Sequence, residues 1–230
     1  MKITYFGHAA FQFTLENGST LLFDPYRNQL PGGDWFLHQF PPQAPDYVVI
    51  THPHFDHDEI GTLTNTPSII RDPFALVEGD GFKLTSLLDK HAKGFGASFG
   101  AWNIIFVLES EGVRICHWGD NQPDLTAEQI QSLGEIDVLI LPIEDGAHLL
   151  ELPEVEQVIG YTNPKIIFPV HYHIDGLTNP DAGLTGIDDW LAAREGVKLI
   201  NANNIQLSQP GLPVSTEVWA FSDACVVEAL

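Results

Sequence analysis

Residues 52–57 read His52-Pro53-His54-Phe55-Asp56-His57, and this short stretch carries most of the information about the fold. It places three imidazoles and one carboxylate within six residues. It directly follows the apolar segment Tyr47-Val48-Val49-Ile50, which has the pattern of a buried strand. Imidazole nitrogen and carboxylate oxygen are common ligands of divalent metal ions in proteins. The sequence therefore predicts a metal site at the end of this strand.

The spacing within the motif supports this prediction. In an extended segment, residues i and i+2 project to the same side, so His52 and His54 can reach one ion. Pro53 lies between them, fixes its own φ and disfavours a helix at His52. The acidic pair Asp58-Glu59 suits the positive end of a helix dipole, so we expect a helix to begin there. The alternative is a histidine-rich surface loop without a function.

Length and composition indicate one globular domain over residues 1–230. Hydrophobic residues make up 44% and charged residues 18% of the chain, which is typical of a folded protein. Ten Lys and Arg residues against 31 Asp and Glu residues give a net charge of −21. Such a surface repels nucleic acid and anionic membranes, so we expect a small-molecule substrate and neither of those partners.

The two cysteines, Cys116 and Cys225, are too few for a disulfide framework or a cysteine-rich zinc site. Cys116 lies in a strand pattern and is expected in the core. The first residues lack the apolar run of a signal peptide, and no segment has the length of a membrane span. We therefore expect a cytoplasmic protein. The sequence leaves its oligomeric state open, homo-oligomers included.

The chain repeats one order of elements. Asn17-Gly18 predicts a hairpin between residues 11–15 and 20–23, and Glu111-Gly112 predicts another between residues 103–108 and 113–116. An acidic residue and then an apolar strand follow each hairpin, which indicates two similar halves in one domain. Further helices are expected over residues 125–133, 152–160 and 187–195, with strands over residues 137–141, 165–170 and 197–201.

Three more ligand candidates follow predicted strands or their connections. These are His91, Asp120 and His171. Strand ends that share one edge of a sheet bring distant residues into one cleft. We therefore expect the three side chains to complete the site that begins at His52.

The full set of residues resembles a known family. The pattern His52-x-His54-x-Asp56-His57, followed by His91, Asp120 and His171 in this order, resembles the metallo-β-lactamase superfamily. Segments 6–11, 22–25, 117–120 and 169–172 are similar to segments of its small stand-alone hydrolase branch, which is related to the ascorbate-6-phosphate lactonase type. The resemblance covers residues 1–201.

This resemblance implies a four-layer αββα sandwich, an α/β (α+β) fold, with a two-metal site at one edge. It implies that His52, His54 and His91 hold one ion, that Asp56, His57 and His171 hold the other, and that Asp120 bridges both. It further implies that a metal-bridging hydroxide is the nucleophile, with Asp56 as a catalytic residue that orients it. Zinc is the default pair of ions, and manganese or iron would also suit these ligands.

The predicted function is a binuclear metal-dependent hydrolase that cleaves a small-molecule ester, lactone or phosphate ester. The alternatives are a phosphodiesterase or nuclease of the same superfamily and a non-catalytic metal-binding module. Redox-active diiron relatives carry glutamate at the position of His54, and the best-known β-lactamases carry cysteine at the position of Asp120. Electron transfer and β-lactam hydrolysis are therefore disfavoured.

Several other residues have two interpretations. His8 and His117 are expected to be hydrogen-bonded structural or orienting histidines, and Asp24 an orienting or turn residue. The roles of three further residues stay open: His148, Tyr172 and His173.

The long segment Tyr26–Pro45 contains Trp35, Phe36 and Phe40, which either form an aromatic wall over a substrate or pack into the core. Three cations near the predicted site are candidates for holding an anionic substrate: Arg27, Lys90 and Lys93. The last segment, Gln209–Leu230, is expected to be a strand or an interface segment.

Overall fold

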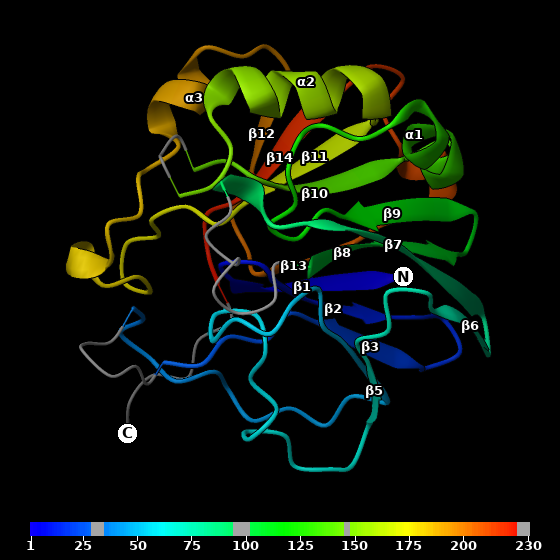
Figure 1. Ribbon diagram of the computed structural model, residues 1–230. Coiled ribbons are helices and arrows are strands. Elements are labelled where there is room, and N and C mark those ends of the chain that lie inside the picture. The colour runs from blue at the N-terminus through cyan, green and yellow to red at the C-terminus, as the bar shows by residue number, and fades with distance from the viewer. Residues whose placement is uncertain (29–34, 94–101, 145–147, 225–230) are drawn as a thin grey trace.

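Two β-sheets pack face to face in the computed structural model, and helices cover the outer face of the larger sheet (Figure 1). The structure describes residues 1–28, 35–93, 102–144 and 148–224. Cys225, part of the Tyr26–Pro45 segment and the end of the Gln209–Leu230 segment lie outside the described residues.

The smaller sheet has six strands and contains the first predicted hairpin. In spatial order they are β13 (Asn204–Gln206), β1 (Lys2–Gly7), β2 (Ala10–Thr14), β3 (Thr20–Phe23), β4 (Tyr47–Val49) and β5 (Ser68–Ile70). Strands β2 and β3 pair antiparallel, with Phe11 opposite Phe23 and Thr14 opposite Thr20. Gly18 turns the chain between them at φ +91°, a conformation that glycine adopts at little cost. The predicted hairpin is confirmed.

The larger sheet has eight strands and contains the second hairpin. In spatial order they are β12 (Val197–Ile200), β14 (Glu217–Phe221), β11 (Ile166–Val170), β10 (Val138–Pro142), β9 (Val113–His117), β8 (Trp102–Ser110), β7 (Phe82–Lys90) and β6 (Leu76–Gly79). Strand β14, from the Gln209–Leu230 segment, lies between β11 and β12 and runs parallel to both. That segment therefore supplies an interior strand of the sheet.

The two sheets share one pairing pattern. Along β1–β5 the successive pairs are antiparallel, antiparallel, parallel and parallel. Along β7–β11 the same four kinds of pair follow in the same order. This topology confirms the two similar halves predicted from the sequence.

The helices α1 (Ala127–Leu133), α2 (Leu152–Thr162) and α3 (Asp188–Ala192) form the layer above the larger sheet (Figure 1). Capping boxes begin α1 at Thr126 and α2 at Glu151, and both are favourable helix starts. Short 3₁₀ turns cover Pro180–Ala182 and Gln209–Gly211. In the part of the chain that the structure describes, no helix is both long enough and apolar enough to cross a membrane.

The two sheets and the helices above the larger sheet are consistent with the expected αββα sandwich. Over the smaller sheet, the described part of the outer layer consists of connecting segments, drawn blue to cyan below that sheet in Figure 1.

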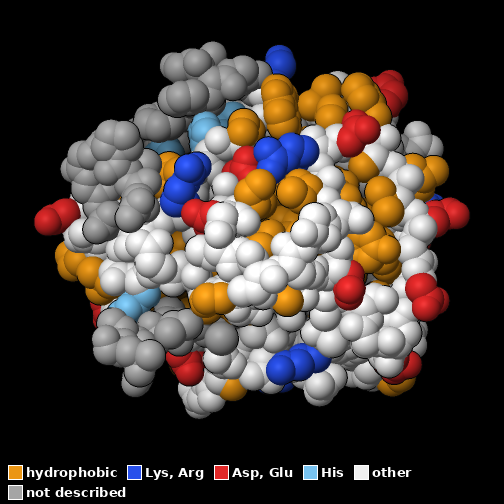
Figure 2. Space-filling view, turned by 90° about the horizontal axis from the view of Figure 1, so that it is seen from below, with side chains coloured by type: hydrophobic (Ala, Val, Ile, Leu, Met, Phe, Trp, Pro, Cys, Tyr) orange, Lys and Arg blue, Asp and Glu red, His pale blue; other side chains and the backbone are white. Residues whose placement is uncertain are grey.

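Two apolar cores stabilise the layers. Phe11, Phe106 and Phe168 belong to the core that joins the two sheets, while Leu139 and Val155 belong to the core beneath the helices. Cys116 lies in the second core as predicted, and burial raises the pKa of its thiol to about 12. On the face shown in Figure 2, acidic side chains are spread around the rim and cationic ones are few, in line with the net charge of −21.

Candidate metal centre

The His52–His57 motif forms one tight turn after strand β4. His52, Asp56 and His57 are buried, and His54 is partly buried. The carbonyl of His54 accepts hydrogen bonds from the backbone N–H groups of His57 (3.0 Å) and Asp58 (2.9 Å). The turn folds the motif back on itself and directs its polar side chains inward.

The helix predicted to begin at Asp58 is wrong, since residues 58–67 form turns and irregular chain. Asp58 instead forms a bidentate ion pair with Arg71, and the N–H of Glu59 donates to the carbonyl of Pro25 at 2.7 Å. These contacts bind the segment to neighbouring loops. They outweigh the weak preference of acidic residues for a helix start.

The three distant ligand candidates lie at strand ends on the same edge of the sandwich. His91 follows β7, Asp120 follows β9 by three residues, and His171 follows β11. All three side chains are buried, with at most 4% of the residue exposed. The fold therefore brings the seven ligand candidates predicted from the sequence into one region.

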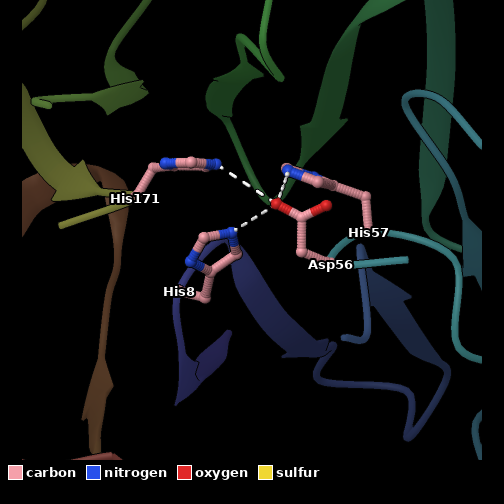
Figure 3. Close-up of side chains that lie close together, drawn as sticks. All are labelled: His8, Asp56, His57 and His171. Atoms are coloured by element: carbon pink, nitrogen blue, oxygen red, sulfur yellow. Dashed lines mark hydrogen bonds and ion pairs between the residues drawn. The ribbon is translucent and has the colours of Figure 1, made fainter. Parts of the chain in front are cut away.

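Together with His8, these seven side chains form two clusters, in each of which the candidate ligand atoms lie within 4.8 Å of one another; a third such group, Glu144, His148 and His171, shares His171 with the second cluster. The first cluster is His52, His54, His91 and Asp120, and the second cluster is His8, Asp56, His57 and His171. Figure 3 shows the second cluster, in which the carboxylate of Asp56 points between three imidazoles. Its Oδ2 lies 3.0 Å from Nε2 of His8, 3.5 Å from Nε2 of His57 and 3.3 Å from Nε2 of His171.

Asp120 connects the two clusters. Its Oδ2 lies 3.5 Å from Nε2 of His52 and 3.4 Å from Nε2 of His91, both in the first cluster. The same atom lies 3.4 Å from Nε2 of His57 and 3.6 Å from Nε2 of His171, both in the second cluster. One carboxylate oxygen thus faces four imidazoles, which is the placement that a bridging ligand requires.

Hydrogen bonds fix four histidine rings so that Nε2 points into the centre. Nδ1 of His52 bonds to Oγ1 of Thr51 (3.0 Å), that of His57 to Asp24 (2.8 Å), that of His91 to the carbonyl of Ala92 (2.8 Å) and that of His171 to Glu144 (2.9 Å). Metal-binding histidines are typically oriented in this way, by a hydrogen bond from the other ring nitrogen.

Several of the nitrogen and oxygen atoms that face the centre lack a hydrogen-bond partner within the described chain, whereas Oδ2 of Asp56 has one in His8. Among the described residues, these buried unpaired atoms include Nε2 of the same four histidines and both carboxylate oxygens of Asp120. A buried polar atom without a partner costs about 1–3 kcal/mol, so a group of them at one point is unstable unless another group binds there. A set of imidazole nitrogens and carboxylate oxygens fits borderline divalent cations such as zinc.

Both carboxylates are held in the ionised form. Burial on its own would raise the pKa of Asp56, but the charge of His57 and the hydrogen bond with His8 hold it well below its usual range. Burial would also raise the pKa of Asp120, and the surrounding imidazoles, His57 first, lower it well below its usual range. Both side chains are therefore anionic at neutral pH, as metal ligands must be.

The pKa values of the histidines are shifted in two directions. Burial lowers the pKa of His52 well below its usual range and that of His8 to about 4. Burial also acts to lower the pKa of His171, but Asp120 and Asp56 overcome it and raise that pKa to about 10. A divalent cation would compete with these protons for the same nitrogens.

Three residues of the centre have a left-handed backbone conformation. The φ angles are +55° at His8, +42° at Asp24 and +61° at His171. Non-glycine residues adopt this region at a cost of about 1–3 kcal/mol and do so preferentially at functional sites. The fold tolerates three such residues at the same edge.

Asp24 and Glu144 orient the histidines. Asp24 accepts hydrogen bonds from the backbone N–H (2.8 Å) and hydroxyl (2.6 Å) of Thr51 and from the ring of His57 (2.8 Å), which agrees with its predicted orienting role. Glu144 bonds to the rings of His171 (2.9 Å) and His148 (3.2 Å). It is not among the site residues predicted from the sequence. Its position just after the apolar strand β10 is the signal that could have revealed it, because the His52–His57 motif follows β4 in the same way.

His8 and His117 both make hydrogen bonds, and His8 also belongs to the second cluster. Nε2 of His8 bonds to Asp56 at 3.0 Å, and Nε2 of His117 bonds to the carbonyl of Ala9 at 2.9 Å. Tyr172 is buried, with its hydroxyl 3.5 Å from the carbonyl of Phe221. His173 pairs with the exposed Asp175. These contacts direct Tyr172 and His173 to partners outside the two clusters.

Lys93 is a poor candidate for holding an anionic substrate. Its ammonium group pairs with Glu151 at 3.1 Å and with Glu154 at 3.0 Å. The two carboxylates of helix α2 therefore already neutralise this cation.

The chain is similar to known proteins over most of its length. The family model described as the beta-lactamase superfamily domain matches residues 2–171. A UPF0173 metal-dependent hydrolase from Enterococcus faecalis is 28% identical over 204 residues, covering 75% of this chain and 87% of that protein. Another from Archaeoglobus fulgidus is 28% identical over 219 residues, covering 79% and 87%.

A crystal structure from Thermotoga maritima is similar over almost its full length. It is described as a candidate Zn-dependent hydrolase of the metallo-beta-lactamase superfamily. The two chains are 28% identical and superpose with a TM-score of 0.73, covering 96% of this chain and 97% of the other.

Proposed function

The chain belongs to the beta-lactamase superfamily, and from this premise we propose that it is a metal-dependent hydrolase with two ions in its buried centre. We propose that the ions are zinc and that the substrate is a small-molecule ester or lactone. The observation that supports this best is the set of unpaired Nε2 and carboxylate atoms that face one another in the two clusters.

The residues have distinct proposed roles. His52, His54 and His91 would hold one ion, and His57, His171 and Asp56 the other, with Asp120 shared between them. When bound, such ions supply Lewis acidity and lower the pKa of a coordinated water to about 7. Asp24, Thr51, Ala92 and Glu144 keep the four histidine rings in the tautomer whose Nε2 can bind a cation.

Asp56 is the proposed catalytic residue. Its carboxylate is ionised at neutral pH, so it can accept a hydrogen bond from water and orient it toward a carbonyl carbon. His8 donates to the same carboxylate at 3.0 Å and fixes its position. In the overall reaction, water adds to the carbonyl carbon, the bond to the leaving oxygen breaks, and an acid and an alcohol are released.

Elemental analysis combined with a substrate screen tests the proposal. The purified protein is expected to hold about two zinc ions per chain and to hydrolyse carboxylic esters or lactones faster than bis-p-nitrophenyl phosphate or single-stranded RNA. Chelation should abolish turnover, and added zinc should restore it.

A pair of histidine variants provides the matched control. His57→Ala removes an inward-facing Nε2 and should lower turnover by about 10³-fold. His173→Ala removes an imidazole that pairs with exposed Asp175 and should have little effect. Full activity after metal removal would contradict the proposal. Preference for phosphodiesters would favour the nuclease alternative, and bound metal without turnover would favour the binding module.

A further inference from the structure

We propose that the substrate has an uncharged, apolar acyl group, aromatic or branched, that lies against the rings of Trp35 and Phe55. This inference rests on the proposed hydrolase function and narrows its substrate class. It places an apolar recognition surface beside the second cluster.

The position of Trp35 is the first observation. Its ring packs edge-on against Phe55 at 5.1 Å between centroids and against His148 at 5.9 Å. It lies 6.3 Å from the ring of His8 and 6.4 Å from that of His171, both in the second cluster. Phe55 itself stands inside the metal motif, between His54 and Asp56. The two rings therefore adjoin the place where the reacting carbonyl would be held.

The burial of neighbouring aromatic residues is the second observation. Phe36 and Phe40 are about 1% exposed, and both stack or pack against Tyr26 in the core. Trp35 and Phe55 are only partly buried. Two roles were considered for the aromatic residues of segment Tyr26–Pro45. Core packing applies to Phe36 and Phe40, and the wall over a substrate is the role that we propose for Trp35. Phe36 and Phe40 anchor the segment, which leaves part of Trp35 available to a ligand.

The backbone holds both rings in place. The carbonyl of Trp35 accepts a hydrogen bond from Asn179 at 2.8 Å, and the N–H of Leu37 donates to Leu177 at 2.7 Å. The carbonyl of Phe55 accepts from the N–H of Arg27, also at 2.7 Å. Surfaces fixed before binding lose less entropy when a ligand arrives, so these rings suit recognition.

Two of the cations around the centre are already paired and are not available to an anionic substrate. Among the described residues, the ion pairs of the two clusters and of Glu144 join histidines to carboxylates. Lys93 is neutralised by Glu151 and Glu154, and Arg71 by Asp58. A phosphate or carboxylate on the acyl side would meet the rings of Trp35 and Phe55, which offer it no compensating charge.

The test measures selectivity between two neutral esters. The zinc-loaded protein is expected to hydrolyse 4-nitrophenyl phenylacetate with a kcat/KM about tenfold higher than that for 4-nitrophenyl acetate. Trp35→Ala should remove this preference, mainly through a higher KM for the larger ester. Trp35→Phe, which keeps a ring, should restore most of it. Phe74→Ala, which truncates an aromatic side chain that is 78% exposed, should leave the ratio unchanged.

Binding without turnover gives a second readout. The neutral, uncleaved compound 2-phenylacetamide should bind wild-type protein about tenfold more tightly than Trp35→Ala in calorimetry. Equal binding, or an unchanged ester ratio in Trp35→Ala, would overturn the inference even if the protein is a zinc hydrolase. Tighter binding to wild type without any ester turnover would support the apolar surface and count against the proposed reaction.

Discussion

The two halves of the sandwich share a strand order but contribute to the centre in different ways. After β1 and β7 the chain carries His8 and His91, and after β3 and β9 it carries Asp24 and Asp120. Among the described residues, Nε2 of His91 has no hydrogen-bond partner and lies 3.4 Å from Asp120, whereas Nε2 of His8 is hydrogen-bonded to Asp56. Equivalent strand ends thus hold a candidate ligand in one half and an orienting group in the other.

The contrast between the two aspartates is the clearest. Asp24 accepts three hydrogen bonds, while both oxygens of Asp120 lack a hydrogen-bond partner among the described residues. The same side chain in related positions is therefore hydrogen-bonded within the described protein in one half and not in the other. In this pair, hydrogen bonding, rather than residue type or strand position, distinguishes the orienting residue from the ligand candidate.

The largest expected effect comes from Asp120→Asn. This change removes the charge that faces four imidazoles, so the chain should retain fewer than two ions and lose about 10³-fold in ester turnover. Elemental analysis and steady-state kinetics measure both quantities. Two bound ions with activity within tenfold of wild type would show that Asp120 bridges nothing.

The same substitution at Asp24, in the other half, should have a smaller effect on zinc binding. In Asp24→Asn, an amide N–H₂ in place of Oδ2 would face the ring N–H of His57 and force the other tautomer, lowering zinc affinity about 10–100-fold. Glu144→Gln should lower it about tenfold, because Glu144 orients one ligand candidate, His171, whereas Asp24 supports His57 directly and His52 through Thr51. Competition with a zinc-binding dye gives these affinities. An effect of Asp24→Asn as large as that of Asp120→Asn would remove the distinction between the two aspartates.

The smallest expected effect is on the free energy of unfolding and concerns Asp89. This residue lies two positions before His91, and Phe6 lies two positions before His8 in the first half. Burial raises the pKa of Asp89 to about 6. The folded state therefore holds this proton more tightly than the unfolded chain, and the resulting stability is present below about pH 4 and lost as the pH rises through 6. Asp89→Asn should match wild type near pH 3.5 and exceed it by about 1 kcal/mol at pH 7.5.

Urea unfolding of both proteins at the two pH values measures this difference. Comparing the variant with wild type at each pH cancels the shared effect of metal release in acid. A difference that does not change with pH would show that Asp89 has an ordinary pKa.

Local sequence signals predicted much of the fold and the candidate ligands. The hairpin at Asn17-Gly18 and the strand before His52 depend on neighbouring residues, so they could be read directly. The centre could be anticipated because strand ends bring together His91, Asp120 and His171. The helix expected at Asp58 was wrong because its ion pair with Arg71 depends on a contact that local propensity does not contain.

Non-local pairing explains most of what the sequence did not show. Glu144 gave no motif of its own, and its role depends on the approach of His171 from another strand. The place of β14 between β11 and β12 likewise depends on pairing between distant segments.

The position of β14 has a consequence for how the chain is made. Strand β12 is synthesised before β14, yet among the described strands of the larger sheet it pairs with β14 alone. The hairpins of both halves can form while the ribosome is still translating, but that edge of the sheet must wait until residues 217–221 have left the exit tunnel. During this interval β12 and the open side of β11 are unpaired strand edges, and such edges promote association between nascent chains.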